Sequence, residues 1–546
     1  MKKRPVKYIF VLGGVLSGLG KGIVSASLGY LFKSLRLKVT IQKLDPYLNI
    51  DPGTMNPYQH GEVFVLDDGS ETDLDLGHYE RFINENLSEK NTTSSGRIYW
   101  DVLSKERQGD YLGETIQVIP HITDEIIDRI KSVNPRHKYD VVITEVGGTV
   151  GDIEGQPFME AIRQLCLKVG YENSLIIHLT LLPYISAAGE IKTKPTQHSV
   201  MLLREIGLQP DLLVCRTENN HHLTQKLKKK LGLFCNMDVD HVFESPDVET
   251  IYEIPLILYK QGMDTKILKR LKLLELTDTH HDVQYLEKFV HRYKNPEGEV
   301  TIAICGKYNS LHDAYKSILE AFIHAGVENK VAVKIKWVDT EALESQNTVD
   351  FPEEFKDVDG ILIPGGFGNR GIEGKIKSAG IARKYNIPFF GICLGLQCAI
   401  IEFARAICDL PKADSTEFKK RTSTPVIDLM HGQKKVKSKG ATMRLGEYSC
   451  EVKPKTKVHS AYKKRLISER HRHRYEVNNE YRQLIEDQGM IVCGINKDLD
   501  LVEMIELSGH PWYVGVQFHP ELKSRVIQAH PLFRDFIAAA KIFHDE

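Results

Sequence analysis

The sequence predicts an α/β protein of two domains, each with a mostly parallel sheet flanked by helices. Two observations predict this class: apolar segments of strand length recur along the chain, and a segment with helical periodicity follows each of them. The alternation stops over residues 268–299, where the chain is charged and less regular, and restarts at Val300. A length of 546 residues suffices for several domains of about 150 residues each. We therefore expect a first domain over residues 1–267, a linker over 268–299 and a second domain over 300–546.

The composition excludes some classes of protein. The 72 Lys and Arg residues balance 73 Asp and Glu residues, whereas a general nucleic-acid binder carries a basic excess. No run of 18 apolar residues is present, so we expect neither a membrane span nor a membrane partner. The basic N-terminus resembles the start of a signal peptide, but a glycine-rich turn follows the short apolar run, which we interpret as a first strand. The nine cysteines show no disulfide-framework spacing, which favours a reducing cytoplasm.

The predicted strands fall into two series. The first series is Tyr8–Leu12, Val39–Asp45, Asp140–Glu145, Ser174–Leu182 and Asp211–Arg216. The second series is Val300–Cys305, Val331–Val338, Gly360–Ile363, Pro388–Ile392, Met490–Ile495, Leu501–Ile505 and Trp512–Phe518. Ligands of parallel sheets bind at the carboxyl edge, so we expect the functional residues where these strands end.

A glycine-rich segment, residues 13–22, follows the first predicted strand and opens a helix. Such a turn binds phosphate, because backbone amides approach the anion and the helix N-terminus and Lys21 add positive charge. It is not a strict P-loop, since five residues separate Gly14 from Gly20 and Gly22 stands where a magnesium-binding hydroxyl is expected. The alternative is a glycine-rich turn without a ligand.

Acidic and basic side chains accompany this turn. Glu145 ends a predicted strand and Asp75 lies in an acidic segment; either alone is typical of an exposed loop. Beside a phosphate loop they favour a Mg-ATP site, since Mg²⁺ takes one or two carboxylates together with phosphates. Lys43 ends the second strand, and residues 192–197 carry two lysines, which makes a second polyphosphate plausible against a plain surface interpretation.

The second series of strands contains a candidate nucleophile. Gly391 and Gly395 flank Cys393 between a strand and a helix, the spacing of a nucleophile elbow. The helix N-terminus favours the thiolate, although a lone buried cysteine is usually inert. His519 can take the thiol proton, and Glu521, two positions on and on the same face, can orient the imidazole.

Further polar groups suit an amino-acid substrate. Residues 363–368 form a second strand followed by glycines, which suits an oxyanion-hole amide. Glu417 and Arg474 are candidates for binding an ammonium and a carboxylate; the alternative for each is a surface charge.

Several motifs together resemble the CTP synthase family over nearly the whole chain. They are GGVLSGLGKG, KLDPY, DPGTM, QHGEVFV, ETDLDLGHYE, GGTVGDIE, KTKPTQHS, GICLG and RHRHRYEVN. The resemblance implies a P-loop-like amidoligase (synthetase) domain over residues 1–267 and a class I glutamine amidotransferase domain over 300–546.

The resemblance also implies roles for individual residues. ATP would contact Gly18, Leu19, Gly20, Lys21, Gly22, Ile23, Lys43 and Asp75, with Asp247, Val248 and Glu249 near the adenine and with Mg²⁺ on Asp75 and Glu145. UTP, and CTP as inhibitor, would contact Ser17, Asp152, Ile153, Glu154, Lys192, Thr193, Lys194, Pro195, Thr196, Gln197 and Lys230. Glutamine would contact Gly366, Leu394, Gly395, Leu396, Gln397, Glu417 and Arg474 around Cys393, His519 and Glu521, and His60 and Val63 would lie near an ammonia passage.

The implied activity is the ATP-dependent amination of UTP to CTP with nitrogen from L-glutamine. The family also uses GTP as an activator and CTP as a feedback inhibitor, and it assembles as homotetramers. Two alternatives stay open: another ATP-dependent amidoligase with the same two modules, acting on a carboxylic acid, and a non-catalytic nucleotide sensor or filament-forming scaffold.

Overall fold

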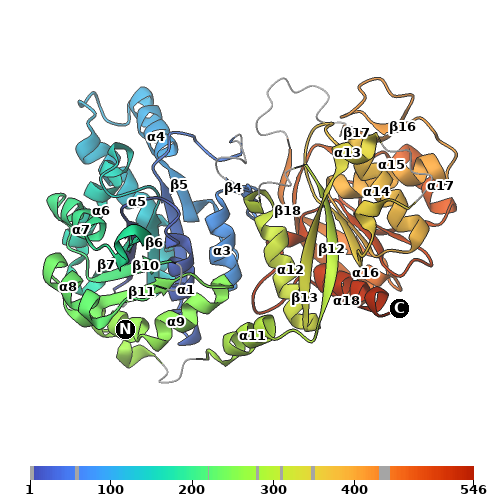
Figure 1. Cartoon of the computed structure of the whole chain (residues 1–546). Helices are drawn as coiled ribbons and strands as arrows, with labels where there is room; N and C mark the ends of the chain where they lie inside the picture. The colour runs from blue at the N-terminus through green and yellow to red at the C-terminus, as the bar shows by residue number, and fades with distance from the viewer. Residues whose placement is uncertain are drawn as a thin grey trace. The chain divides into compact units, whose positions relative to one another are not determined.

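The computed structural model describes residues 5–53, 55, 61–218, 221–277, 282–307, 312–345, 351–429 and 443–546 (Figure 1). The chain divides into two compact units. Unit 1 contains Met1–Thr54 and Thr72–Val290, and unit 2 contains Met55–Glu71 and His291–Glu546. This division differs from the uninterrupted first domain expected over residues 1–267, because the segment Met55–Glu71 groups with the second half of the chain.

Unit 1 is built on a seven-stranded sheet in the order β11-β10-β7-β1-β6-β2-β5, and every neighbouring pair is parallel. The strands are β1 (Lys7–Gly13), β2 (Val39–Asp45), β5 (Thr92–Ser94), β6 (Val141–Val146), β7 (Ser174–Leu181), β10 (Leu212–Thr217) and β11 (Val242–Pro246). A small ladder in unit 1 pairs β8 (Tyr184–Ile185) with β9 (Glu190–Ile191). Another ladder pairs β3 (Phe64–Val65), which belongs to unit 2, with β4 (Glu71–Thr72), where the chain returns to unit 1.

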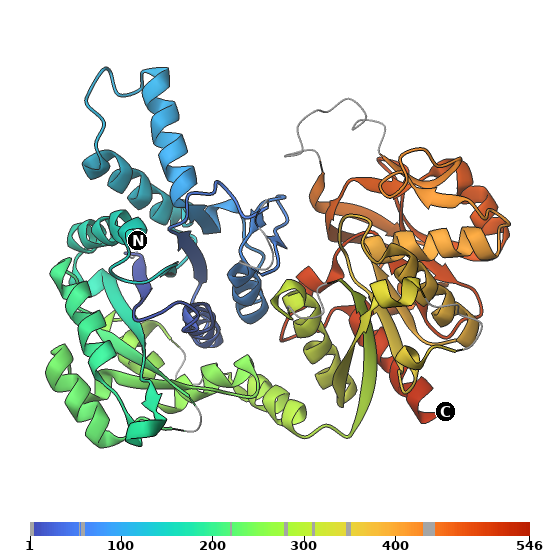
Figure 2. The same cartoon turned by 45° about the horizontal axis from the view of Figure 1, so that its top comes forward.

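Helices cover both faces of this sheet (Figures 1 and 2). They are α1 (Lys21–Ser34), α3 (Leu74–Ile83), α4 (Ser95–Gln108), α5 (Thr123–Ser132), α6 (Gln156–Val169), α7 (Lys194–Glu205), α8 (Gln225–Cys235), α9 (Ile254–Lys260) and α10 (Met263–Arg270). A further helix, α11 (Gln284–Lys294), crosses the division between the two units at Val290. Alternate residues of β1 pack on opposite faces, and Phe10 and Leu12 join one buried cluster with Val102 of α4, Ile126 of α5 and Ile162 of α6. In Figure 2, α4, drawn in light blue, projects away from the sheet.

Unit 2 contains a nine-stranded sheet in the order β13-β12-β14-β15-β23-β22-β21-β18-β19. Its parallel part is β12 (Gly298–Gly306), β13 (Val331–Asp339), β14 (Gly360–Ile363), β15 (Phe389–Ile392) and β23 (Tyr513–Val516). An antiparallel extension adds β22 (Leu501–Leu507), β21 (Met490–Asn496), β18 (Arg444–Val452) and β19 (Leu466–His473). A small sheet holds β16 (Ala413–Ser415), β17 (Thr424–Leu429) and β20 (Tyr475–Val477).

The helices of unit 2 also lie on both sides of its sheet. They are α12 (Lys316–Asn329), α13 (Thr340–Glu344), α14 (Ile372–Tyr385), α15 (Leu394–Ala406), α16 (Lys457–Tyr462), α17 (Arg482–Asp487) and α18 (Pro531–Asp545). The predicted fold class, two helix-flanked and mostly parallel α/β sheets, is confirmed. Two strands of the antiparallel extension, β21 and β22, correspond to the predicted strands Met490–Ile495 and Leu501–Ile505, whereas β18 and β19 were not predicted.

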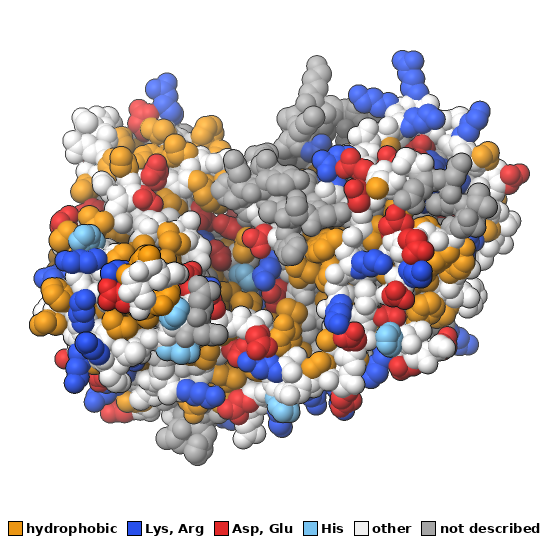
Figure 3. All heavy atoms as spheres, in the orientation of Figure 1, with side chains coloured by type: hydrophobic (Ala, Val, Ile, Leu, Met, Phe, Trp, Pro, Cys, Tyr) orange, Lys and Arg blue, Asp and Glu red, His pale blue; other side chains and the backbone are white. Residues whose placement is uncertain are grey.

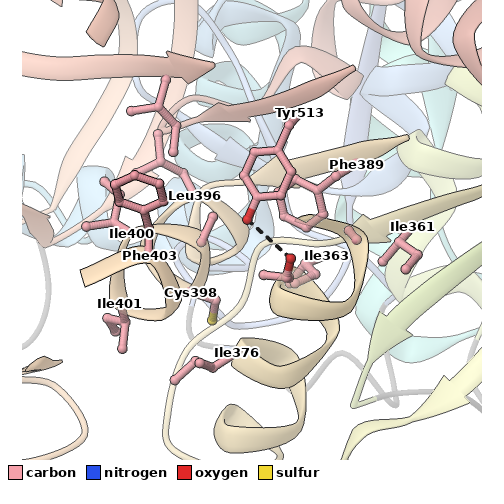
Figure 4. Close-up of a cluster of buried hydrophobic side chains, with 14 of the residues drawn as sticks. Ile361, Ile363, Ile376, Phe389, Leu396, Cys398, Ile400, Ile401, Phe403 and Tyr513 are labelled. Carbon is pink, nitrogen blue, oxygen red and sulfur yellow. Dashed lines mark hydrogen bonds between the residues drawn. The ribbon is translucent and has the colours of Figure 1, made fainter. Parts of the chain in front are cut away.

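A dense core supports the start of α15 (Figure 4). Phe389 of β15 stacks on Tyr513 of β23 with ring centroids 4.4 Å apart, and both side chains are fully buried. Ile363 of β14 and Leu396 of α15 belong to the same cluster, so the turn between β15 and α15 rests on close-packed side chains.

The described surface carries mixed charge. On the face shown in Figure 3, Lys and Arg side chains are interspersed with Asp and Glu side chains. Among the described helices, none is both long and apolar enough to cross a membrane.

We expect Phe389→Ala to lower the free energy of unfolding by about 3–5 kcal/mol, because it leaves a cavity and removes a stacked partner of Tyr513. Urea denaturation followed by tryptophan fluorescence measures this change. Ile542→Ala on α18, where the side chain is 63% exposed, is the control and should change stability by less than about 0.5 kcal/mol. Equal losses for both variants would contradict the described packing.

Candidate functional site

In unit 1, the glycine-rich loop connects β1 directly to α1 at the carboxyl edge of the sheet. Gly20 caps α1 with φ +88°, a left-handed conformation that glycine adopts without a steric penalty. Lys21, the first residue of α1, is buried and donates to the Gly148 carbonyl at 2.8 Å. Burial lowers the pKa of this lysine, while the Glu145 carboxylate opposes the shift.

Gly22 explains how this loop differs from a strict P-loop. A Cβ atom at Gly22 would lie 2.2 Å from Oδ1 of Asp75 and 3.4 Å from Oε2 of Glu145. The space of the expected hydroxyl side chain is therefore occupied by a carboxylate that α3 supplies, and two carboxylate oxygens converge on the start of α1.

Lys43 lies at the centre of a buried charge cluster. It pairs with Asp75, with Glu145 at 3.2 Å and with Asp45 at 3.9 Å. Burial opposes charge on Lys43, but these carboxylates hold its pKa well above the usual value. Burial would likewise raise the pKa of Asp75, but Lys43 lowers it. At Glu145 burial outweighs Lys43 and the pKa rises, and Tyr79 donates its hydroxyl to this carboxylate.

Three further residues lie at this edge that were not predicted from the sequence. Asp45 follows Lys43 on the same face of β2, and burial raises the pKa of its carboxyl to about 8. Tyr79 follows Asp75 by one helical turn, a spacing that could have identified it. Arg216 of β10 pairs with Asp247 at 2.6 Å, and its Nη1 lies 3.3 Å from the Cβ position of Gly20. Arg216 thus places Asp247, which follows β11, beside the loop.

Most of the residues expected to bind the uridine nucleotide lie in two segments, at residues 152–154 and at the start of α7. Some of these side chains are exposed and others are buried. Asp152, at the start of a short 3-10 helix, accepts from the Thr149 amide at 2.9 Å, and the neighbouring Ile153 is 78% exposed. At the start of α7, the buried hydroxyl of Thr196 accepts a hydrogen bond from the Thr180 hydroxyl at 3.0 Å. Lys194 is exposed.

Lys230 of α8 is exposed, and its charge contributes with that of Lys192 to lowering the pKa of Glu190. The structure therefore brings Lys192 and Lys230, which are distant in sequence, into one electrostatic neighbourhood.

In unit 2, Cys393 occupies a sharp turn between β15 and α15. Its φ of +52° and ψ of −100° are strained for a residue with a side chain. A Cβ at Gly391 would lie 2.7 Å from the Gly395 backbone, and one at Gly395 would lie 2.3 Å from the Ile363 carbonyl oxygen. Both glycines are therefore required sterically, as a nucleophile elbow demands.

His519 and Glu521 follow β23 beside this turn. Nδ1 of His519 lies 2.7 Å from Oε1 of Glu521. Burial opposes a proton on His519, but the Glu521 carboxylate and the Cys393 sulfur raise its pKa to about 10. Nε2 makes no hydrogen bond to the described residues, so this ring nitrogen is where the imidazole holds the proton that the sulfur gives up. Gln517, which the sequence analysis did not single out, donates to Sγ of Cys393 at 3.7 Å.

The proposed amino-acid residues surround the same turn. Glu417 accepts from the Gly368 amide at 2.9 Å, and burial raises its pKa against the charges of Lys307 and Arg474. Gly366 lies against Leu394, whose Cδ2 is 3.6 Å from the Cβ position of this glycine. The structure thus places Gly366 against Leu394, the residue after Cys393, and brings the charges of Glu417 and Arg474 together at the loop that contains Gly368.

The segment that precedes Glu71 folds onto unit 2. Asp67 accepts from Nε of Arg470 at 2.6 Å, and Glu71 accepts from Nε of Arg472 at 2.7 Å. Val63 lies in this segment and is half-buried, whereas His60 is outside the described residues.

We expect iodoacetamide to alkylate Cys393 first near neutral pH, because His519 can accept its proton. Burial raises the pKa of Cys398, five residues away, to about 12, so this thiol is an internal control that stays protonated. Mass spectrometry of labelled peptides measures both rates, and Glu521→Gln should slow only the first. Equal labelling of the two cysteines would overturn the elbow assignment.

Comparisons with known proteins agree over the whole chain. Residues 7–273 match the family model of the CTP synthase N-terminus, and residues 310–539 match that of class-I glutamine amidotransferase. The CTP synthase of Chlorobium phaeobacteroides is 57% identical over 541 residues, which is 99% of this chain and 95% of that protein. The CTP synthase of Clostridium acetobutylicum is 56% identical over 534 residues, 98% of each chain.

A solved structure of the Trypanosoma brucei CTPS glutaminase domain with bound acivicin is 36% identical, with 44% of this chain and 94% of that chain covered and a TM-score of 0.42. The family assignment comes from the full-length relatives. With more than half of its residues identical to theirs over nearly its whole length, the chain belongs to the CTP synthase family.

Proposed function

We propose that this chain converts UTP to CTP with ATP and the amide nitrogen of L-glutamine, a step of pyrimidine nucleotide synthesis. The observation that carries the proposal is the presence, in one chain, of a Cys-His-Glu elbow and of a buried lysine–carboxylate cluster beside a phosphate loop. The first arrangement releases ammonia from an amide, and the second activates a phosphoryl group. Residues 1–267 carry the synthetase chemistry and residues 300–546 the glutaminase chemistry.

At the nucleotide end, the 4-oxygen of UTP attacks the γ-phosphorus of ATP, and the bond from that phosphorus to ADP breaks. Residues Gly18–Ile23 and Lys43 bind the ATP phosphates, and Asp247–Glu249 lie beside the adenine, where Arg216 holds Asp247 near the loop. Ser17, Asp152–Glu154, Lys192–Gln197 and Lys230 bind UTP, or CTP as the inhibitor. Ammonia then attacks C4 of the pyrimidine, and phosphate leaves.

The residues at Gly22 fit a magnesium ion. Oxygens of Asp75 and Glu145 converge there, and hard carboxylate donors are what Mg²⁺ prefers. Bound with ATP, the ion supplies neutralisation of phosphate charge. Lys43 supplies positive charge beside the same carboxylates. It lowers the pKa of Asp75 and so keeps that carboxylate ionised.

At the glutamine end, Cys393 attacks the amide carbon while His519 takes the thiol proton and returns it to the leaving nitrogen, so ammonia leaves uncharged. Glu521 holds the imidazole through Nδ1. Gly366 and Leu394–Gln397 line the glutamine, Glu417 binds its ammonium, and Arg474 binds its carboxylate. Water then hydrolyses the thioester.

Neutral ammonia must reach the nucleotide without being protonated in water, and we assign its passage to Val63 and to His60, which is outside the described residues. GTP activates the reaction, and CTP inhibits it by feedback.

The active form is a homotetramer. Exposed apolar side chains on α4, Trp100 at 61% and Leu103 at 55%, suit an interface between copies. The enzyme works in the cytoplasm, which fits nine cysteines of which none is in a disulfide.

We expect Cys393→Ala to lose glutamine-dependent CTP formation by at least about 10³-fold, because no other group forms the thioester. CTP formation with added ammonium chloride should stay within about twofold of the wild type, since the synthetase residues are untouched. An assay of CTP with each nitrogen source measures both. Equal loss with glutamine and ammonia would contradict two separate centres, and no CTP from the wild type with either source would favour a carboxylate-specific amidoligase or a sensor.

We expect Lys21→Ala to reduce ammonia-dependent CTP formation by at least about 10²-fold, because the phosphates lose a buried charge. Glutamine binding to unit 2, measured by calorimetry, should persist. Lys33→Ala, on the same helix and paired with Glu85 at 3.1 Å, is the matched control and should have little effect. Unimpaired synthesis by Lys21→Ala would remove the phosphate-loop assignment.

A further inference from the structure

Behind the Cys393 turn, unit 2 buries a cluster of five titratable side chains that take no part in the chemistry proposed above. They are His471 and His473 of β19, Arg444 of β18, Glu476 of β20 and Glu503 of β22. Each of them is at most 3% exposed. Charged groups are rarely buried so completely unless each one is paired.

Three successive contacts link the Tyr475 carbonyl, His473, His471 and Glu503 into a chain. Nδ1 of His473 lies 3.2 Å from the Tyr475 carbonyl oxygen and 3.4 Å from Oε1 of Glu476. Nε2 of His473 lies 2.9 Å from Nδ1 of His471. Nε2 of His471 lies 3.6 Å from Oε2 of Glu503, just beyond hydrogen-bond distance, and neither of these two buried atoms has a hydrogen-bond partner among the described residues.

The three contacts of this chain need one proton more than two neutral imidazoles carry. Each contact joins two atoms that both carry lone pairs, so each is attractive only when one proton lies between them. Three contacts need three protons, whereas two neutral imidazoles supply two. One additional proton therefore resides on the chain, either on a histidine or on the Glu503 carboxyl.

The charge balance of the cluster agrees with this count. Arg444 pairs with Glu503 and lies 3.5 Å from Glu476, so one guanidinium faces two carboxylates. A single additional proton makes the whole group neutral, which a site away from water requires.

The additional proton is best placed on a carboxyl. Burial raises the pKa of Glu503 to about 7 and that of Glu476 to about 8, against the Arg444 charge. Burial lowers the pKa of both histidines, and the Arg444 charge adds to this shift.

Groups from neighbouring elements act in the same direction. His519 and Lys523 also lower the pKa of His471, whose ring meets those of Tyr448 and Phe518 edge-on. The charge of Glu503 in turn helps to raise the pKa of Cys450. Because Oε2 of Glu503 forms the end of the chain, a proton there is donated to Nε2 of His471.

Each end of the chain is connected to Gln517, which contacts the nucleophile. One connection runs through Gln397 and the other through the main chain of Glu503. The Tyr475 carbonyl also accepts from Nε2 of Gln397 at 3.1 Å, and the same amide lies 3.3 Å from Oε1 of Gln517. At the other end, the link is through the main chain: the backbone carbonyl of Glu503 accepts from the backbone amide of Gln517 at 2.8 Å. Nε2 of Gln517 donates to Sγ of Cys393.

We propose that the chain Glu503–His471–His473 carries one additional proton at neutral pH and acts as a positioning element, which holds Gln517 against the sulfur of Cys393. The proposal rests on the proposed glutaminase function of this sulfur. The three residues act through Gln397 and Gln517 and touch no substrate. Loss of the proton places two lone pairs in contact at His471 and Glu503 and loosens both ends of the chain.

The test compares two substitutions of the same carboxyl. Glu503→Gln keeps an N–H donor for His471 at every pH and leaves Arg444 paired with Glu476. Glu503→Leu has similar bulk but no donor. We expect Glu503→Leu to lower kcat/KM for glutamine hydrolysis about tenfold, the effect of one lost hydrogen bond, and Glu503→Gln to rescue most of the loss.

The pH profile and infrared spectrum separate positioning from simple stability. In the wild type, raising the pH removes the proton from Glu503, so kcat/KM for glutamine should fall on an alkaline limb that Glu503→Gln shifts upward. The wild type at neutral pH should also show the carbonyl band of a buried protonated carboxyl, and Glu503→Gln should lose the part of this band that Glu503 contributes, whereas Glu476→Gln should keep that part. Ammonia-dependent CTP formation is measured in each variant as the readout of intact folding.

Glu503→Gln behaving like Glu503→Leu, or a wild type without the protonated-carboxyl band, would overturn the proposal. If Glu503→Leu does not fold, the infrared band and the pH profile of Glu503→Gln still distinguish the two outcomes. A wild type that hydrolyses no glutamine would instead defeat the proposed function, and the infrared band would still show separately whether the additional proton is present.

Discussion

The pairing of Lys43 with Asp75 and Glu145 is the interaction on which the nucleotide half of the protein depends. These groups lie at the carboxyl edge of a parallel sheet, out of water, where a lone charge is too costly to keep. Lys43 keeps Asp75 ionised, and Asp75 in turn occupies the space that Gly22 leaves open. The phosphate loop and the carboxylates therefore form one unit, since a side chain at position 22 would displace the acid.

The same constraint shapes the glutaminase half. His519 is buried between a carboxylate and a sulfur, and it is stable there because both partners favour its protonated form. The strained backbone of Cys393 is maintained by a close-packed core beneath it and by glycines that allow the chain to pass the Ile363 carbonyl. In both centres, buried charged groups pair with one another, and this pairing holds their side chains in place where no water can stabilise the charges.

The sequence predicted the parts of the fold that depend on local pattern. The Val- and Ile-rich strands and the polar residues at their ends are recognisable because a strand covered on both faces must be apolar throughout. It could not predict β18 and β19, because both strands bury charged residues, such as Arg444 and Arg470, where an apolar run would be expected. Nor could it show that Asp67 pairs with Arg470, 403 positions away, since such a contact exists only after folding. Arg216 was missed because a single arginine at a strand end has no distinguishing spacing.

Isotope competition tests the central claim, transfer of glutamine nitrogen to the pyrimidine ring within the protein, most directly. Glutamine labelled with ¹⁵N in its amide is supplied with ATP and UTP while unlabelled ammonium chloride is present in excess at a pH where protonated ammonium dominates. The account predicts that the CTP formed from glutamine keeps the ¹⁵N label and is not diluted toward the isotope ratio of the solution. CTP carrying the isotope ratio of the bulk ammonium would contradict it.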